Sequence, residues 1–262
     1  MSVYGMANQI FNVSGKKAIV TGGARGLGRE MSLCLLENGC DVFATSRRIE
    51  GNEEFIDLAA KSGSKLYLHS SDITNSEDVV SMIKLAMEKM GRIDILINAA
   101  GINILKKFTE MDDESFETVM RTNVNASFSV TREVAKVMKE QKYGKIINIS
   151  SIRSMLGASD IGYSAYATSK AAINMLTKQV ACELASDHIT VNAIAPTFIK
   201  TNMNAAQLEN VTFRQALEAR IPVGRIGQFT DLMGLMLLLA SDASAFITGQ
   251  TILLDGGISA RQ

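Results

Sequence analysis

The sequence has few of the residues that build metal sites. Its 262 residues include three cysteines and two histidines, and the cysteines lack the spacing of metal ligands. We therefore expect no metal, and we expect Cys34, Cys40 and Cys182 to be small core residues in a reducing cytoplasm. His69 and His188 are too scattered for a Ser–His couple, so each is expected in the core or on the surface.

The sequence also lacks an excess of charge and a long apolar run. Lys plus Arg and Asp plus Glu number 27 each, so nothing favours nucleic acid or an acidic membrane surface as a partner. No apolar run approaches the roughly 20 residues of a membrane helix, and the N-terminus lacks the pattern of a secretory signal. We expect a cytoplasmic protein with a small-molecule substrate and without a nucleic-acid or membrane partner.

No proline-rich linker, internal repeat or low-complexity segment divides the chain, so a single domain over residues 1–262 is expected. Apolar β-favouring runs alternate with helical patterns, which predicts a mainly parallel sheet with helices on both faces. Right-handed crossovers then give a doubly wound, Rossmann-type α/β fold with seven strands in the order 3-2-1-4-5-6-7. The expected strands are 17–21, 41–46, 65–70, 93–98, 145–150, 189–195 and 251–255, and the expected helices are 26–38, 52–62, 76–90, 113–140, 164–185 and 230–240.

A glycine-rich turn follows the first expected strand. The run Thr21-Gly22-Gly23-Ala24-Arg25-Gly26-Leu27-Gly28 separates the apolar residues 17–20 from an amphipathic helical pattern that Asn38-Gly39 closes. Glycines let the backbone approach a pyrophosphate, and the helix N-terminus offers free N–H groups and partial positive charge. The turn therefore predicts a dinucleotide site, with an ordinary loop as the alternative.

Tyr166 and Lys170 lie one helical turn apart, so the phenol and the ammonium project from the same face. A nearby ammonium lowers the pKa of a tyrosine from its usual value of about 10, which gives a proton donor or acceptor near neutral pH. Ser151, fifteen residues before Tyr166, supplies a hydroxyl to hold the substrate oxygen. Taken alone, an exposed Tyr–Lys pair is the alternative interpretation.

These motifs, in their order, resemble those of the short-chain dehydrogenase/reductase family, from about Phe11 to the C-terminus. The chain departs from the commoner pattern at Ala99, where a second Asn is frequent, and at Thr197, where Gly usually follows Pro. Thr197 leaves open the conformation of the loop beside the expected nicotinamide. The further motifs that carry the resemblance are Asp72, Asn98-Ala99-Ala100-Gly101, Asn123 in Thr122-Asn123-Val124-Asn125, Val191-Asn192-Ala193-Ile194-Ala195-Pro196 and Leu254-Asp255-Gly256-Gly257.

The resemblance implies a dehydrogenase acting on CH–OH groups, in which nicotinamide carries the hydride and the protein handles the proton. It implies that Tyr166 is the acid/base, that Ser151 steadies the oxygen and that Lys170 bonds the nicotinamide ribose. The Asn123 carbonyl would hold a water that links Lys170 to solvent, with an exposed helical Asn as the alternative. The implied catalytic residues are Asn123, Ser151, Tyr166 and Lys170, and the implied cofactor-binding residues are Gly22, Arg25, Gly26, Leu27, Gly28, Ser46, Arg47, Asp72, Ile73, Asn98, Ala99, Gly101, Tyr166, Lys170, Pro196, Ile199 and Thr201.

Arginines at the end of the second expected strand favour NADP(H). NAD enzymes place an acidic residue there to bond the ribose 2′-hydroxyl, whereas this chain has Ser46 followed by Arg47 and Arg48. Arg25 can approach the same ribose from the glycine turn, and guanidinium groups suit a 2′-phosphate. The alternative is that Arg47 and Arg48 are solvated surface charges.

The segment Ser151–Gly157 resembles that of the gluconate 5-dehydrogenase group, as do residues 11–16 and 231–234. This resemblance implies a keto sugar acid such as 5-keto-gluconate, with Ser151, Arg153 and Tyr166 contacting the substrate. Arg153 either clamps a substrate carboxylate, or points to solvent or bonds a neighbouring carboxylate. Residues 197–223 are expected to form a substrate-closing lid.

Other activities remain as alternatives. A 3-oxoacyl-[acyl-carrier-protein] reductase should show a basic surface, which the balanced charge does not favour, and a nucleotide-sugar epimerase usually has a larger C-terminal domain. A non-catalytic nucleotide sensor has little need for the Ser, Tyr, Lys and Asn set. A hydroxysteroid dehydrogenase needs a broad apolar lid, whereas this lid is polar at Asn202, Asn204, Gln207, Glu209 and Asn210.

The expected helices 113–140 and 164–185 carry more apolar positions than one sheet face can cover. The family commonly pairs these helices across two-fold axes, so the resemblance implies a homotetramer, with a dimer as the alternative. The apolar positions of the second helix include Ala165, Ala167, Ala171, Ala172, Ile173, Met175 and Leu176.

Overall fold

The computed structural model describes residues 7–159, 161–201 and 204–261. Its strands pair in parallel in the order β3-β2-β1-β4-β5-β6-β7, which confirms the predicted topology. The strands are β1 (Lys17–Thr21), β2 (Asp41–Ser46), β3 (Leu66–Ser70), β4 (Ile95–Asn98), β5 (Gly144–Ile149), β6 (Ile189–Pro196) and β7 (Thr251–Leu254). The α-helices are α1 (Ala7–Ile10), α2 (Gly26–Glu37), α3 (Glu53–Lys61), α4 (Ser76–Met90), α5 (Asp113–Met120), α6 (Ala126–Gln141), α7 (Ser164–Leu184), α8 (Ala205–Glu209), α9 (Val211–Glu218) and α10 (Phe229–Ala240).

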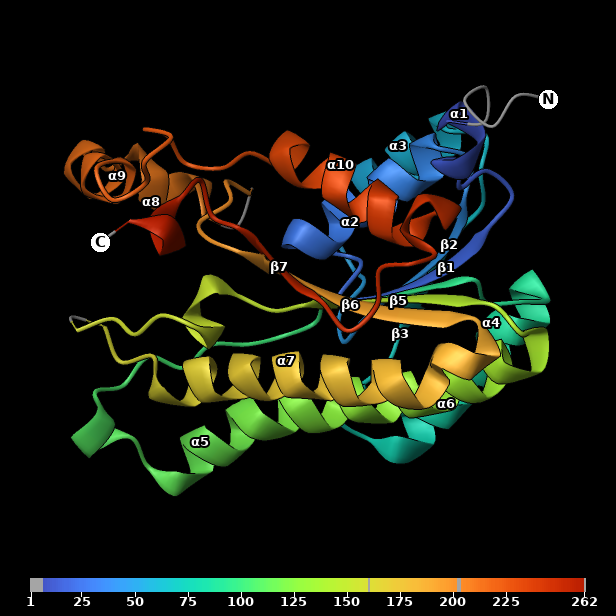
Figure 1. Ribbon diagram of the computed structural model, residues 1–262, viewed down its shortest axis with the longest axis horizontal. Helices are drawn as coiled ribbons and strands as arrows, with labels where there is room; N and C mark the ends of the chain where they lie inside the picture. Colours follow the sequence, from blue (N-terminus) through green and yellow to red (C-terminus); the bar gives the residue numbers. More distant parts are fainter. Residues whose placement is uncertain (1–6, 160, 202–203, 262) are drawn as a thin grey trace.

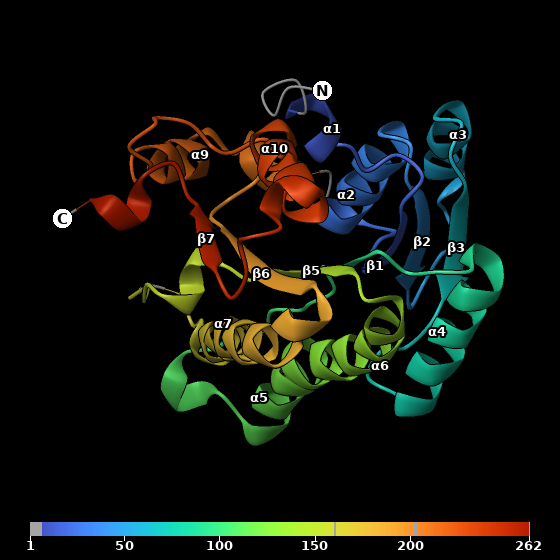
Figure 2. The ribbon, with the colours of Figure 1, turned by 45° about the vertical axis from the view of Figure 1, so that its right-hand side comes forward.

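Helices cover both faces of the sheet because successive residues of each strand point to opposite sides. Along β1, Ala18 and Val20 join one apolar core with α2, α3 and α10, while Ile19 joins a second core with α4 and α6. Figures 1 and 2 show these two helical layers, with α5, α6 and α7 on the side of α4. Because the strands of this covered sheet are parallel, they all end at the same edge.

The predicted helix 113–140 is wrong as one continuous α-helix. A π-helical turn, Arg121–Asn125, separates α5 from α6. Asn123 belongs to this turn and lies inside the molecule, where only 1% of it is exposed. Apolar periodicity continues across the turn, so the sequence pattern did not show it.

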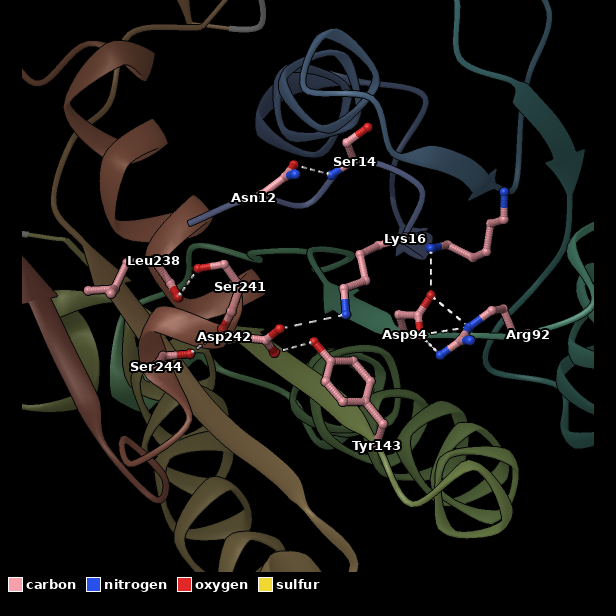
Figure 3. A network of polar contacts seen from close by, with 11 residues as sticks. Asn12, Ser14, Lys16, Arg92, Asp94, Tyr143, Leu238, Ser241, Asp242 and Ser244 are labelled. Atoms are coloured by element: carbon pink, nitrogen blue, oxygen red, sulfur yellow. Dashed lines mark hydrogen bonds and ion pairs between the residues drawn. The ribbon is translucent and has the colours of Figure 1, made fainter. Parts of the chain in front are cut away.

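A polar network joins the amino ends of three strands, at the edge opposite the strand ends that carry the motifs (Figure 3). Tyr143, just before β5, donates a hydrogen bond of 2.8 Å to Asp242 Oδ1. The Lys16 Nζ, just before β1, lies 3.9 Å from Asp242 Oδ2 and 4.0 Å from the centre of the Tyr143 ring. Before β4, Arg92 Nε donates to Asp94 Oδ1 at 2.9 Å. These contacts fix the loops at the amino edge of the sheet. The motifs lie at the opposite, carboxyl edge.

Two of the three cysteines follow the prediction. Cys34 and Cys40 are buried, whereas Cys182 lies on the exposed side of α7, so its assignment to the core is wrong. His69 lies half-buried on β3, and His188 is exposed. In the parts of the chain that the structure describes, no helix has the length and apolar character to cross a membrane, and no cluster of His, Cys, Asp or Glu could hold a metal ion.

The expected lid, residues 197–223, contains α8 and α9. Leu208 and Ile221 pack with Ile226 into a small apolar cluster of its own. The polar residues serve the lid backbone: Asn204 Oδ1 accepts from Thr201 N at 2.8 Å, and Asn210 Oδ1 accepts from Phe213 N at 3.0 Å to cap α9. Asn202 lies outside the described residues.

Candidate active site

The turn between β1 and α2 requires glycine at two positions. Gly22 has φ +67°, and a Cβ there would lie 2.9 Å from Ala100 Cα. A Cβ on Gly28 would lie 2.3 Å from the Gly22 carbonyl oxygen, which is closer than any side chain tolerates. No side chain caps the N-terminus of α2 at Arg25, so the first helical N–H groups point into the turn as an anion site.

A cavity of about 630 Å³ opens beyond this turn, at the carboxyl ends of β1, β2 and β4. Most of the predicted cofactor residues line it, whereas Asn98, Tyr166, Lys170, Pro196, Ile199 and Thr201 do not. Thr45, Ser71, Thr74, Ala100, Ile102 and Thr122 also line it and were missed. The predicted lining residues are Gly22, Arg25, Gly26, Leu27, Gly28, Ser46, Arg47, Asp72, Ile73, Ala99 and Gly101.

The groups that line the cavity fit a phosphorylated dinucleotide. Thr45 Oγ1 and Ser71 Oγ are buried and have no hydrogen-bond partner among the described residues, which is costly unless a ligand supplies one. Arg25, Arg47 and Arg48 are among the residues that line the cavity. Hydrogen bonds from the backbone and side chain of Thr74, together with the charge of Arg47, hold the pKa of Asp72 below its ordinary value.

Helix α7 carries Tyr166 and Lys170 on one face, as predicted. The Lys170 Nζ donates a 2.7 Å hydrogen bond to the Ile149 carbonyl and lies 5.6 Å from the centre of the Tyr166 ring. Lys170 is buried and Tyr166 is half-buried, so an exposed Tyr–Lys pair is excluded. Burial lowers the pKa of Lys170 to about 8.

The expected lowering of the Tyr166 pKa does not hold in the structure. Burial raises the pKa of Tyr166 above its ordinary value, a hydrogen bond to Ser151 opposes this, and the charge of Tyr163 adds to it. The reason is that desolvation penalises the phenolate more than the Ser151 hydroxyl stabilises it. Lys170 directs its ammonium to the Ile149 carbonyl rather than to the phenol oxygen.

Asn123 is fixed by its own amide group. Its Oδ1 accepts from Ile102 N at 2.8 Å, and its Nδ2 donates to Ile102 O and to Ser169 Oγ, each at 2.9 Å. The exposed-asparagine alternative is therefore wrong. The Asn123 carbonyl accepts a 2.9 Å bond from the Ser127 hydroxyl.

The Asn98 side chain ties the ends of two neighbouring strands. Its Nδ2 donates to Asn148 Oδ1 at 2.8 Å and to Thr131 Oγ1 at 2.9 Å, which joins the ends of β4 and β5. Ile199 lines a separate cavity of about 240 Å³ together with Thr197, whose backbone N–H bonds the Leu254 carbonyl at 3.0 Å.

Ser151 and Arg153 belong to the short turn after β5. Ser151 begins a 3-10 helix, Ile152–Ser154, and its Oγ accepts from Arg153 N at 3.2 Å. Arg153 Nη1 donates to the Gly157 and Leu156 carbonyls at 2.8 and 3.4 Å, and its guanidinium carbon lies 5.2 Å from the centre of the Tyr163 ring. Arg153 is thus held by its own loop, and no ion pair joins it to a carboxylate in the described residues.

Known proteins resemble the chain over nearly its full length. A family model described as enoyl-(acyl carrier protein) reductase matches residues 22–259. The chain is 34% identical to the 3-oxoacyl-[acyl-carrier-protein] reductase of Vibrio cholerae over 94% of its length and 98% of that protein. It is 39% identical to a 3alpha-hydroxysteroid dehydrogenase of Mediterraneibacter gnavus, over 92% of the chain and 96% of the relative. A solved gluconate 5-dehydrogenase from Burkholderia cenocepacia, in complex with NADP and tartrate, superposes with a TM-score of 0.89 at 32% identity and covers 97% of the chain and 98% of its own.

These matches and the site geometry define the class of protein. The chain belongs to the short-chain dehydrogenase/reductase family. It is an oxidoreductase that acts on CH–OH groups with NAD(P).

Proposed function

We propose that this enzyme uses NADP(H) and interconverts a keto sugar acid, such as 5-keto-gluconate, with the corresponding alcohol. Bound nicotinamide supplies or accepts the hydride. In the reductive direction Tyr166 donates a proton to the substrate oxygen, which the Ser151 hydroxyl holds by a hydrogen bond. Lys170 supplies a proton to the phenolate that remains, and the Asn123 carbonyl holds a water through which Lys170 is reprotonated from solvent.

The cofactor preference rests on the arginines that line the large cavity. Arg25, Arg47 and Arg48 surround the place where β2 ends, and Ser46 stands where an NAD enzyme carries a carboxylate. We expect kcat/KM with NADPH to exceed that with NADH, and Arg47→Asp to lower the NADPH value by roughly 10- to 100-fold while sparing NADH. Lys61→Asp, an exposed charge reversal on α3, should change neither. Equal kcat/KM for the two cofactors in the wild type would refute the preference.

The substrate proposal rests on Arg153 after β5 and on Arg220 of the lid, because the positive charge of Arg220 acts on the Arg153 guanidinium. Burial lowers the pKa of Arg153. The charge of Tyr163 raises this pKa, and the charge of Arg220 on the lid lowers it. Arg220 is exposed and follows α9, so the loop after β5 and the lid bring like charges together. A substrate carboxylate between them relieves this repulsion through charge-assisted bonds. Closure of the lid, residues 197–223, would then bring Arg220 towards the acid.

The test is a screen with NADPH over keto sugar acids, acetoacetyl thioesters and ketosteroids. We expect turnover of a keto sugar acid, and we expect Arg153→Ala and Arg220→Ala each to raise its KM by roughly tenfold or more. Arg214→Ala, on the same lid helix, is the matched control. Activity restricted to thioesters or steroids would reject the substrate, and an unchanged KM in both variants would reject the clamp.

A hydroxysteroid is the second candidate because apolar side chains surround the same edge. Phe108, Met155 and Val223 are 82%, 60% and 62% exposed, on the loops after β4, β5 and β6. Of the lid asparagines that argued against a steroid, Asn204 and Asn210 bond the backbone of their own segment. If a ketosteroid is the better substrate, Phe108→Ser should raise its KM and leave that of a keto sugar acid unchanged.

A further inference from the structure

A chain of hydrogen bonds links the catalytic helix to the serine turn. Ser150 Oγ donates to Asn174 Oδ1 at 2.6 Å and lies 3.2 Å from the Lys170 carbonyl oxygen. Asn174 Nδ2 donates to Ser154 Oγ at 2.8 Å, and Ser154 Oγ donates to the Ser151 carbonyl at 2.6 Å. This series of hydrogen bonds therefore runs from beside the Lys170 carbonyl to the Ser151 carbonyl.

Asn174 is the central member of this chain. It follows Lys170 by four residues, and Lys170 follows Tyr166 by four, so the three side chains lie along one side of α7. Both ends of its amide are bonded, the oxygen to the end of β5 and the nitrogen to the turn that Ser151 begins. An amide of this kind acts as a spacer with one donor end and one acceptor end.

We infer that Asn174 is a positioning residue that sets the distance between the Ser151 and Tyr166 hydroxyls. The inference rests on the proposed role of Ser151 in holding the substrate oxygen. Tyr166 is carried by a helix of 21 residues, whereas Ser151 is carried by a three-residue 3-10 turn, which is the softer element. The Asn174–Ser154 bond fixes that turn to the helix, and a misplacement of about 1 Å at such a pair costs up to roughly 100-fold in rate.

The first test compares the kinetics of variants along the chain. Asn174→Leu keeps the branch at Cγ and favours the helix but removes both bonds, and Ser154→Ala removes the far end. We expect each to lower kcat by roughly 10- to 100-fold and to leave the KM for NADPH unchanged, with no larger loss in the double variant because they break one chain. Gln179→Leu removes an exposed Gln179–Glu183 bond on the same helix and should have no effect.

The second test separates positioning from general support of the fold. In a Ser151→Ala background the hydroxyl to be positioned is gone, so Asn174→Leu should change kcat by less than about twofold. A further loss as large as in the wild-type background would overturn the inference. A fall in the thermal midpoint of Asn174→Leu that accounts for its lost activity would also overturn it.

A third readout does not need turnover, so it distinguishes failure of this inference from failure of the proposed reaction. The backbone N–H of Ser154 bonds the Ser151 carbonyl at 2.9 Å, and that of Met155 bonds the Ile152 carbonyl at 3.0 Å. In Asn174→Leu we expect faster amide hydrogen exchange at residues 153–155 and unchanged exchange in β5. Unchanged exchange at residues 153–155 would show that Asn174 does not fix the turn.

Discussion

At the scale of single residues, the proton chemistry depends on a phenol that burial keeps protonated. Because burial raises the pKa of Tyr166, the phenol stays protonated near neutral pH and can donate its proton. We expect Tyr166→Phe to lower kcat by about 10²- to 10⁴-fold, the usual contribution of a positioned acid/base, with the dissociation constant for NADPH unchanged. Tyr67→Phe, which removes a phenol from β3, should retain full activity. Near-normal turnover in Tyr166→Phe would mean that another group carries the proton.

Lys170 makes stability depend on pH in a direction that its burial dictates. Its pKa falls from 10.5 to about 8 on folding, so between these pH values the unfolded chain binds a proton that the folded chain does not, and stability rises with pH. Relative to Lys170→Met, the wild type should gain about 3 kcal/mol in free energy of unfolding across this window. Denaturant titrations of both proteins at pH 7, 9 and 10 measure this difference.

The comparison with the variant is needed because a buried thiol acts in the opposite direction. Burial, with a smaller effect of Glu37, raises the pKa of Cys34 to about 11, so above its ordinary pKa the unfolded chain loses a proton that the folded chain keeps. The thiol is the same in both proteins and cancels in the difference. A constant difference between wild type and Lys170→Met from pH 7 to 10 would show that Lys170 keeps an ordinary pKa.

Single-residue predictions from the sequence succeeded where the backbone position decides the role. The spacing of Tyr166 and Lys170 placed them on one helical face, and Asn98 joins strand ends because it closes β4. The partners of Asn174 were not predictable, since Ser150 and Ser154 lie at a strand end and on a turn that only the fold brings near α7. Thr45 and Ser71 were missed because a hydroxyl at a strand end is common and becomes informative only when it lacks a partner.

At the scale of elements, the alternation of strands and helices was enough to predict the sheet order, since right-handed parallel crossovers leave few arrangements. The π-turn between α5 and α6 was not predictable, because Arg121–Asn125 continues an apolar helical pattern and differs only in its hydrogen bonding. The lid helices were missed because α8 and α9 have only five and eight residues, too few for a clear period.

The β1–α2 turn gives a prediction for an element as a whole. A methyl group on Gly28 cannot fit beside the Gly22 carbonyl, so Gly28→Ala should reshape the turn and lower NADPH affinity by at least roughly tenfold. Gly234→Ala is the matched control: its Cβ meets nothing within 4 Å on α10, and alanine favours the helix by up to about 1 kcal/mol. Titration of NADPH fluorescence measures both variants, and equal affinities would show that the turn tolerates a side chain.

At the scale of the whole molecule, we propose a homotetramer built on α6 and α7. Phe128 and Met175 are 46% and 61% exposed on these helices. Ala165 and Ile173 are buried within the chain and cannot contribute. We expect a tetrameric mass at micromolar concentration, and we expect Phe128→Glu with Met175→Glu to give smaller species, because two charges would be desolvated in the interface. Phe11→Glu, a charge on an exposed phenylalanine near the N-terminus, should leave the mass unchanged, and a monomeric wild type would refute the assembly.

Because Cys182 is exposed, a thiol reagent can label the folded enzyme at this position. The other two thiols are buried, and burial raises their pKa values, so they resist alkylation, which requires the thiolate. A maleimide dye added to the folded protein should therefore attach once per chain, on α7 and without mutagenesis. Energy transfer between dyes on mixed, separately labelled preparations would then report subunit exchange directly.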